Sequence, residues 1–462
     1  MMLRNFFNNF NFSVKEKIES CINVFFNNFN FIEFEKNLIL IFNKEIGVLV
    51  KSILETLFSK FDFIKKLKIV GGKKSMRFRG FKNIKIRLMN GQMISVDSPY
   101  FTRSDSKMGR KKKGPNGRGC HLGLRLFGFI DKYSLNFVDF IAQMGILCPS
   151  AEIASECLSL RNIQIKAKTI IKFTKKLGVA GIKKRGEISF SGEEDYGGKT
   201  LVIGIDGGRI RERKKKRGKR KTGLKQQGYH SDWKEPKLIA MYLLDDTGKV
   251  VKGSKPVYDA TMGNHIECFK MLEKYLVEMS INKLDRIVFC GDGATWIWKG
   301  ILKLCNRLGI QVPVHEVIDY THAKQNLNDL LNLLSTKLKG RKKVVKACKD
   351  FLFSGKIEKI KDTLLSLIKG KKRKSMLKKW KNYFLKNITR MQYHNFKEKR
   401  IPTGSGFVES AIRRVINLRL KSAGIFWKKD TAESFLFLRS QLLSGRWEIF
   451  MCNICKEFRK LA

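Results

Sequence analysis

The chain has 462 residues, enough for two or three domains, and 43% of them are hydrophobic, enough for ordinary folded cores. Its 94 Lys and Arg residues outnumber the 41 Asp and Glu residues, which gives a formal net charge of +53. A compact chain with that much self-repulsion needs a polyanion, so the composition predicts a nucleic-acid partner, with an anionic membrane surface as the weaker alternative. AT-rich coding inflates Lys content, but it does not account for so few carboxylates.

Neither a membrane segment nor a secretion signal is expected. No run of 18 or more apolar residues occurs, and the first residues, MMLRNFFNNFNF, lack a long apolar core and a cleavage site. We therefore expect a cytoplasmic, nucleoid-associated protein that does not bind a membrane. The ten cysteines are scattered, and we expect them to be reduced. Cys452 and Cys455 form a lone C-x-x-C, which is a weak zinc signal without further ligands nearby.

The first 120 residues divide into two segments by composition. Residues 1–70 carry apolar residues at helical spacing and predict helices without a specific chemistry. Residues 71–120 are rich in Gly, Lys and Arg, with a short strand expected at IKIRL (84–88). The second segment predicts a basic, partly extended stretch that lies along a phosphate backbone, and a solvated loop is the alternative.

Residues 121–195 predict a mainly helical DNA-binding region. Within it, residues 151–178 predict one helix, a break near Asn162 and a second helix, which is helix-turn-helix spacing. A plain helical hairpin is the alternative. The polar, Gly-rich stretch 186–200 is the expected domain boundary. The start of a second helix contacts bases in such motifs, and here it carries Lys166, Lys168 and Lys172.

Residues 200–450 predict an α/β domain. Five strand-type runs occur, with helical runs after the third and the fourth: LVIGID, KLIAMYLLDD, KPVYDATMG, RIVFCGDGA and VPVHEVIDYTH. The order β-β-β-α-β-α-β predicts an RNase-H-like core, a mixed five-stranded sheet whose first three strands are antiparallel. A basic stretch at about 322–400 predicts a helical insertion, after which GSGFVES opens a late helix.

Three acidic residues occur where this sheet would bring them together. Asp206 ends the first strand, Asp292 ends the fourth, and Glu409 lies in the first turn of the late helix. Strands one and four are neighbours in this fold, and glycines beside both Asp residues leave room for metal and phosphate. Carboxylates suit two Mg²⁺ (or Mn²⁺) ions, roughly 3.5–4 Å apart, that cleave a phosphodiester. Taken singly, each acid also fits a turn residue or a helix-dipole role.

Four motifs taken together resemble a known family. They are D-G-G-R from Asp206, G-D-G-A-x-W-I from Gly291, D-x-x-H from Asp319, and G-S-G-x-V-E-S from Gly404. The chain resembles bacterial insertion-sequence transposases of the Kra and Lre types, which are similar to Mutator-like transposases. The resemblance covers about 200–447 well and 95–190 loosely. It implies a DDE mechanism, with the two Asp residues and the Glu of these motifs as metal ligands.

Several residues near these motifs are further candidates. His322 would lie near the scissile phosphate and stabilise its charge, or it would cap a helix start. Trp296 and Trp298 would stack on an unpaired base, or they would pack in the core. A basic loop after the first Asp would grip the DNA backbone through Arg209, Arg211, Arg213, Lys214, Lys215 and Lys216.

The expected function is that of a DNA transposase. It would bind the terminal inverted repeats of its element, cleave their 3′ ends and join them to target DNA. Because two ends must meet, we expect a homodimer or a larger assembly on DNA. An RNase-H-like nuclease or resolvase is one alternative, and a non-catalytic DNA-binding repressor derived from a transposase is the other.

Overall fold

The computed structural model describes residues 2–103, 119–185, 196–216, 227–279, 281–422 and 424–460, together with Gly218 and Gly223. Side chains are described from residue 10 to residue 457 within these ranges. The chain forms two compact units, one of residues 1–174 with 451–462 and the other of residues 175–450. Part of the basic segment expected at 71–120, residues 104–118, and part of the expected boundary stretch, residues 186–195, lie outside the described residues.

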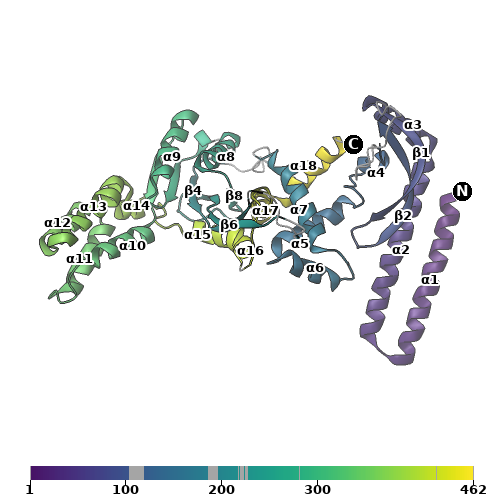
Figure 1. Cartoon of the computed structure of the whole chain (residues 1–462), viewed down its shortest axis with the longest axis horizontal. Coiled ribbons are helices and arrows are strands. Elements are labelled where there is room, and N and C mark those ends of the chain that lie inside the picture. Colours follow the sequence, from purple (N-terminus) through teal and green to yellow (C-terminus); the bar gives the residue numbers. More distant parts are fainter. Residues whose placement is uncertain are drawn as a thin grey trace. The chain divides into compact units, whose positions relative to one another are not determined.

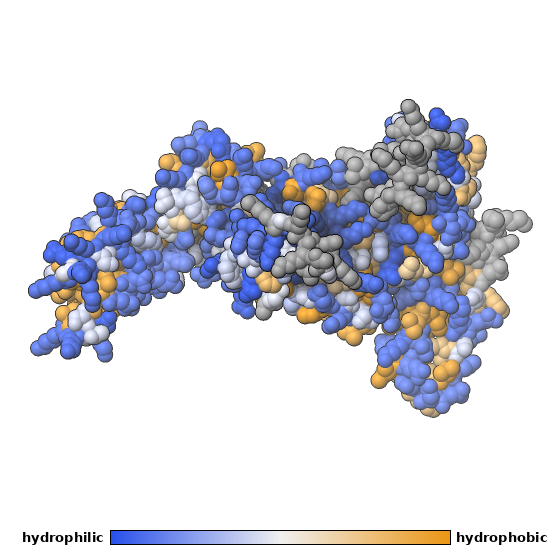
Figure 2. Space-filling view, viewed as in Figure 1, coloured by the Kyte–Doolittle hydropathy of each residue, from blue (hydrophilic) through white to orange (hydrophobic). Residues whose placement is uncertain are grey.

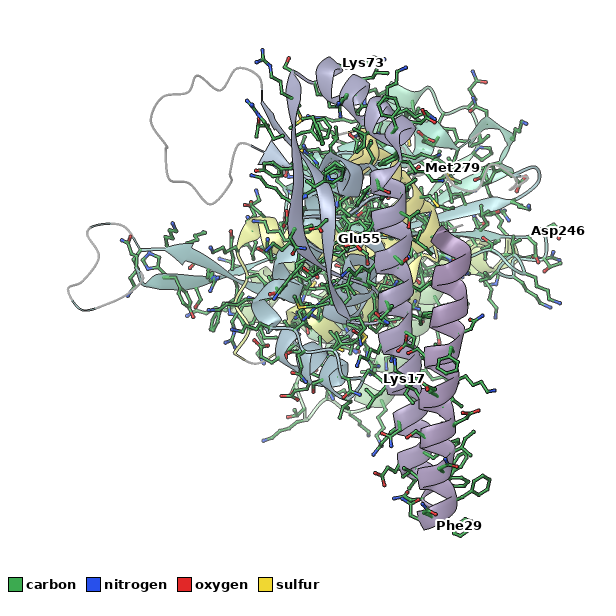
Figure 3. The ribbon with its side chains drawn as sticks, turned by 90° about the vertical axis from the view of Figure 1, so that its right-hand side faces the viewer. Lys17, Phe29, Glu55, Lys73, Asp246 and Met279 are labelled. Carbon is green, nitrogen blue, oxygen red and sulfur yellow. The ribbon has the colours of Figure 1, made fainter. Side chains whose placement is uncertain are left out.

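The first unit begins with a helical hairpin, as the apolar spacing predicted. Helices α1 (Met2–Asn28) and α2 (Phe31–Ser59) run side by side from a turn at Phe29 (Figure 3). The side chain of Asn30 caps α2 by accepting a hydrogen bond from the Glu33 N–H (3.2 Å). Helix α3 (Phe61–Lys73) follows directly.

A three-stranded antiparallel sheet follows, so the described part of the segment expected at 71–120 is extended over more than the one short strand predicted there. Strands β1 (Met76–Arg87), β2 (Met93–Arg103) and β3 (Gly119–Cys120) pair in that order. The pairing of β1 with β2 shifts register between Phe78 and Phe81, around Gly80 (φ 81°). This irregularity interrupts the alternation of apolar residues, which explains why only a short strand was expected from the sequence.

Four helices complete the region before the second unit: α4 (Leu122–Leu126), α5 (Leu135–Leu147), α6 (Ala151–Ser159) and α7 (Ala167–Ile182). The two helices predicted around a break near Asn162 are therefore present, and Asn162 itself has a left-handed backbone (φ 59°). The division between the two compact units falls inside α7. A small core joins α2 to the strands, with Phe58 packed among Ile86, Val96 and Leu124.

The second unit contains the mixed five-stranded sheet that the sequence predicted. Its strands are β4 (Thr200–Gly207), β7 (Lys237–Leu244), β8 (Val257–Thr261), β9 (Arg286–Gly291) and β10 (Val314–Ile318). They lie in the order β10-β9-β4-β7-β8. The first three strands in sequence are antiparallel, and β9 and β10 are parallel to β4.

Two helical crossovers connect the parallel strands, as expected from the periodicity. Helix α8 (His265–Glu278) precedes β9 after a short turn (Ile281–Lys283), and α9 (Thr295–Leu308) precedes β10. A capping box fixes the start of α8, because the Asn264 side chain and the Glu267 side chain each accept the other's backbone N–H. Both helices lie on one side of the sheet, and the late helices α15 and α16 lie on the other (Figure 1).

A run of helices occupies the expected insertion after β10. It comprises α10 (Tyr320–Leu331), α11 (Arg341–Phe353), α12 (Ile357–Leu367), α13 (Gly370–Lys379), a π-helical turn (Trp380–Phe384), a 3-10 turn (Leu385–Arg390) and α14 (Tyr393–Glu398). One hydrophobic core runs from the sheet into this insertion, since buried residues such as Val288, Leu327 and Tyr393 belong to the same cluster. The insertion is therefore packed onto the sheet domain rather than tethered to it.

The late helices close the chain. They are α15 (Gly406–Ala411), a π-helical turn (Ile412–Asn417), α16 (Leu418–Leu420), α17 (Lys429–Leu443) and α18 (Trp447–Lys460). A buried ion cluster joins α17 to β8: Arg185 contacts Asp259 (3.1 Å) and Glu433 (2.9 Å). Within the described ranges, no helix has the length and apolar content to cross a bilayer. Figure 2 shows hydrophilic residues over much of the surface, with apolar residues exposed on the α1–α2 hairpin.

Candidate active site and basic ribbon

Asp206 and Asp292 come together at the carboxyl ends of β4 and β9. Ile205 lies opposite Gly291 in the parallel ladder between these strands, so the two Asp residues follow on neighbouring strands. The Gly207 N–H donates a hydrogen bond to Oδ1 of Asp206 (2.6 Å), and the Ala294 N–H donates one to Oδ1 of Asp292 (2.8 Å). Both carboxylates are half-buried and held by backbone groups.

The surroundings of Asp206 favour its neutral form. Burial, together with the carboxylates of Asp292 and Glu235, raises the pKa of Asp206 to about 6. The hydrogen bond from Gly207 and the nearby imidazole of His322 act in the opposite direction and do not cancel the shift. A half-buried carboxylate with two other carboxylates nearby is destabilised in its charged form, and a bound cation would relieve that cost.

Glu235 is an acidic neighbour that the sequence reasoning missed. A Cβ atom added at Gly207 would lie 2.0 Å from Oε1 of Glu235, so this carboxylate packs over the glycine beside Asp206. Lys237 pairs with it (2.7 Å). Glu235 lies in the turn before β7, and only the antiparallel pairing of Gly207 with Lys237 brings it to the site. A short sequence motif carries no signal of that register.

Glu409 lies on the same side of the sheet as Asp206. Helix α15 packs on β4 through Phe407 and Val408, whose side chains occupy the space over Gly204. Gly204 and Asp206 are two residues apart on one strand and so face the same side. The Glu409 side chain is exposed. Within the described residues, no three His, Cys, Asp or Glu side chains gather closely enough to hold a metal ion, so this arrangement supplies two carboxylates and not a closed set of three.

The D-x-x-H motif joins the end of β10 to the loop before α15. Buried Asp319 is the N-cap of α10, and its Oδ1 accepts a hydrogen bond from the His322 N–H (2.7 Å). Its other carboxylate oxygen accepts one from the Ser405 N–H. Asp319, not His322, therefore caps the helix. The imidazole of His322 is half-buried and close enough to Asp206 to lower the pKa of that carboxyl.

The two candidate tryptophans differ in burial: Trp298 packs in the core, whereas Trp296 is half-buried. Trp298 is buried, its indole N–H donates to the Asp292 carbonyl oxygen (3.1 Å), and the Arg390 guanidinium covers its ring (4.7 Å to the centroid). Base stacking by Trp298 is incompatible with that burial, and its role is to fix the backbone of Asp292. Trp296 is half-buried, with the Lys237 ammonium 4.5 Å from its ring centroid.

A pocket of about 310 Å³ opens beside Asp292. Gly293 and Thr295, which follow Asp292 closely in the chain, form part of its wall. Three cations also line it, Lys299, Lys386 and Arg390. Arg390 is paired with Glu316 (2.5 Å), whereas the two exposed lysines have no ion pair within the described residues. This composition suits a phosphate group adjacent to the acidic pair.

The basic segment after Asp206 is a two-stranded ribbon and not a loop. Strand β5 (Ile210–Lys215) pairs with β6 (Tyr229–Lys234), and the hairpin projects from its unit (Figure 3). The pairing fixes which side chains share a face, because residues directly opposite each other point the same way. Arg211 lies opposite Trp233, and Lys215 lies opposite Tyr229.

One face of this ribbon combines unpaired cations with exposed aromatic rings. The guanidinium groups of Arg209 and Arg211 lie 5.3 and 5.2 Å from the Trp233 ring centroid, and Trp233 is 53% exposed. Arg213 lies 5.8 Å from the exposed ring of Tyr229. Within the described residues, no carboxylate pairs with these three arginines. The opposite face is partly neutralised, because Lys214 pairs with Asp232 (2.9 Å). Trp233 and Tyr229 were missed because β6 was not expected.

The remaining residues predicted to bind DNA or zinc belong to the first unit. Lys166, Lys168 and Lys172 are exposed at the start of α7, and Lys172 pairs with Asp131 (3.0 Å). Cys452 and Cys455 lie on α18.

Comparison with known proteins adds little to this description. No protein-family model matches the chain, and no curated protein matches it. A solved structure, the Drosophila P element transposase strand transfer complex, matches at 12% sequence identity and covers 71% of this chain and 83% of that one. Its TM-score is 0.27, and a likeness of that degree carries no inference about fold or activity.

Proposed function

We propose that this chain is a DNA transposase with an RNase-H-like core, which cleaves the ends of an insertion sequence at their inverted repeats and joins them to target DNA. The observation that carries the proposal is the pair of Asp206 and Asp292 at the carboxyl ends of adjacent parallel strands. The pair belongs to a chain with a net charge of +53, which demands a polyanionic partner. The four motifs that resemble insertion-sequence transposases add to this support.

The sheet supports the RNase-H-like assignment through its strand order. Three antiparallel strands are followed by two parallel strands with helical crossovers, in the order β10-β9-β4-β7-β8. In this order β4 is central, and the ends of β4 and β9 form one edge of the sheet. The helical insertion between β10 and α15 accounts for the long interval between Asp292 and Glu409.

We propose that Asp206, Asp292 and Glu409 hold the divalent metal. The two Asp residues fit because they lie side by side with unrelieved negative charge. Glu409 lies on the helix packed over Gly204, and its exposed carboxylate would complete the ligand set. When bound, two Mg²⁺ (or Mn²⁺) ions activate the attacking oxygen and stabilise the leaving one. Trp298 and the Ala294 N–H keep Asp292 in place, and Asp319 keeps His322 beside Asp206.

The DNA path follows from the cations around this pair. Lys299 and Lys386 line the pocket next to Asp292 and suit the phosphate beside the cleaved bond. The ribbon begins at Ile210, four residues after Asp206, and carries Arg211 and Trp233 on one face. Arginines contact phosphates and exposed aromatic rings stack on bases, so the ribbon grips DNA close to the cut. His322 stabilises charge on a phosphate oxygen.

The test is cleavage and joining by the full chain with Mg²⁺, on labelled duplexes that carry the ends of the DNA element encoding it. Asp206→Asn and Asp292→Asn should each reduce cleavage to below about a thousandth of the wild-type rate while leaving DNA binding intact. Asp246→Asn, a matched change at an exposed loop residue, should cleave normally. Cleavage without joining would identify a nuclease or resolvase instead. DNA binding without cleavage by the wild type would identify a repressor.

A further inference from the structure

The α1–α2 hairpin exposes an ordered apolar stripe that no part of the described chain covers. On α2, Ile32, Ile39, Ile46 and Ile53 are spaced by seven residues and are 68, 51, 47 and 47% exposed. Phe42, also exposed, lies between the second and the third of them. We name these five residues the α2 seam. Figure 2 shows the apolar surface of the hairpin to which it belongs.

The seam is distinct from the faces by which α2 packs in its own unit. Toward α1, buried Glu45 accepts a hydrogen bond from Lys17 (2.6 Å). Toward the sheet, a Cβ at Gly47 would lie 3.1 Å from Ile94, and Phe58 is fully buried. The isoleucines are therefore not needed for the internal fold. Exposed isoleucines in a row promote aggregation, so we expect another surface to cover them.

A seven-residue spacing has a specific structural meaning. An apolar residue every seventh position keeps to one side of a helix when that helix supercoils around another. Isoleucine in this repeat packs well in two-stranded coiled coils. A two-stranded coiled coil has two apolar positions in each heptad. The four isoleucines fill one of these positions over 22 residues, and Phe42 and Leu49 fill the other in the middle of the helix, whereas its ends carry Glu35 and Thr56. The pattern therefore fits a second helix as its partner, and not a small molecule.

The charge distribution indicates which helix that is. Residues 1–62 contain seven Lys or Arg and seven Asp or Glu, so they carry no net charge, and the rest of the chain carries the whole +53. A nucleic-acid partner is therefore not favoured at the hairpin. A second copy fits here, because the remainder of the chain carries +53 in total and repels its own copy, whereas the hairpin meets it without net repulsion.

We propose that two copies of this chain associate through the α2 seam and form a coiled coil between their α2 helices. This goes beyond the proposed function, because it gives the chain a dimer interface that exists without DNA and lies outside the catalytic unit. The same interface would hold two catalytic units in one particle before either meets a DNA end.

The test measures the mass of the full chain by light scattering or sedimentation over a concentration series, after nucleic acid has been removed. Ionic strength of about 1 M reduces the Debye length to roughly 3 Å, so it suppresses charge effects but not an apolar seam. The wild type should have the mass of two chains. The variant Ile39→Lys/Ile46→Lys should have the mass of one chain, with an unchanged circular dichroism spectrum because both residues are exposed.

Two controls tie the result to the seam. Val48 is exposed on the same helix and lies about 200° around the axis from Ile46, so Val48→Lys should leave the dimer intact. A chain with Ile39→Glu/Ile46→Glu should be monomeric alone, and it should pair with the Lys variant when the two are mixed at about 0.1 M salt, where the Debye length is roughly 10 Å and opposite charges still attract. A wild type that is monomeric at every concentration would overturn the proposal. So would a Lys variant that dimerises as well as Val48→Lys does, or complementary variants that do not pair.

Discussion

Asp206 and Asp292 each lie one residue beyond the Ile205–Gly291 pair of the parallel β4–β9 ladder. Two carboxylates at the same level of neighbouring strands repel each other, and here they are also half-buried, so the fold maintains them against an electrostatic cost. The nearby imidazole of His322 lowers the pKa of Asp206 without cancelling the shift. A bound cation would offset the remaining cost, which makes the stability of the second unit depend on pH in a definite direction.

The first prediction concerns Asp206→Asn. The pKa of Asp206 in the folded chain, about 6, lies above its ordinary value of 3.8, so folding disfavours the charged form. Asp206 therefore costs stability above pH 6, and this cost disappears as the pH falls through 6 toward 4. The Asn variant should be more stable than the wild type by on the order of 2 kcal/mol at pH 7.5 and equally stable at pH 4.

Tryptophan fluorescence during urea unfolding provides the measurement. All six tryptophans, Trp233, Trp296, Trp298, Trp380, Trp427 and Trp447, belong to residues 175–450, so the signal reports the second unit alone. Asp246→Asn serves as the control for loss of one exposed carboxylate. Equal stabilities of Asp206→Asn and the wild type at pH 7.5 would show that Asp206 is not strained by burial and its neighbours.

The second prediction concerns Mg²⁺. A metal ion binds the ionised carboxylates, so it competes with protons for Asp206. Mg²⁺ should raise the stability of the second unit at pH 7.5, and the gain should diminish as the pH falls below about 6. The gain should be absent in Asp292→Asn, which lacks one carboxylate of the pair. A gain of the same size at pH 5 as at pH 7.5 would place Mg²⁺ elsewhere.

The sequence predicts those residues of the site whose neighbours follow from the order of the strands, and it misses those whose neighbours depend on finer details. Asp206 and Asp292 were expected together because a strand-type run ends at each and the pattern of strands sets the neighbours. Glu235 was not expected at the site, because a one-residue change in register of β7 would move it to the other side of the sheet. Trp298 was ambiguous, because helical spacing alone does not say whether an indole faces the core or the solvent.

The N-terminal sheet shows a second reason for a missed element. Strand β1 has an irregularity at Gly80, so its apolar residues do not alternate over its whole length and only its end, at 84–88, fitted a strand template. The β5–β6 ribbon was missed for a different reason. Strand β6 is exposed at every position, so neither of its faces is buried and its sequence shows no alternation of apolar and polar residues. By contrast, α1 and α2 pack on neighbours and were expected from their spacing.

The third prediction concerns Trp233→Ala on the ribbon. If its ring stacks on bases near the cut, removal should weaken binding to DNA with unpaired bases by about tenfold or more, since stacking contributes roughly 1–3 kcal/mol per base. Binding to fully paired DNA should change little. Lys214→Ala is the matched control, because Lys214 lies on the opposite face and pairs with Asp232. Fluorescence anisotropy at one fixed salt concentration measures both. An equal loss on paired and unpaired DNA would assign the ribbon to backbone contacts only.

The fourth prediction concerns Arg185, whose ion pairs join the end of α7 to β8 and α17. Its partner Asp259 is fully buried and also accepts hydrogen bonds from the Tyr275 hydroxyl (2.9 Å) and the Ala260 N–H (2.8 Å). Arg185→Met removes the cation and leaves that charge buried, so it should destabilise the second unit by about 3–5 kcal/mol. Because burial raises the pKa of Asp259, the loss should shrink as the pH falls and the carboxyl takes up a proton.

Two comparison variants separate the buried charge from other causes. Arg185→Met/Asp259→Asn removes both charges, so it should recover part of the stability that Arg185→Met loses, although the sites are in contact and the effects will not add. Arg307→Met breaks an exposed pair with Glu273 and should cost about 0–1 kcal/mol. Urea unfolding followed by tryptophan fluorescence measures all three. If the double variant is less stable than Arg185→Met at pH 7.5, the loss in the single variant comes from packing of the Arg185 side chain and not from the unpaired carboxylate.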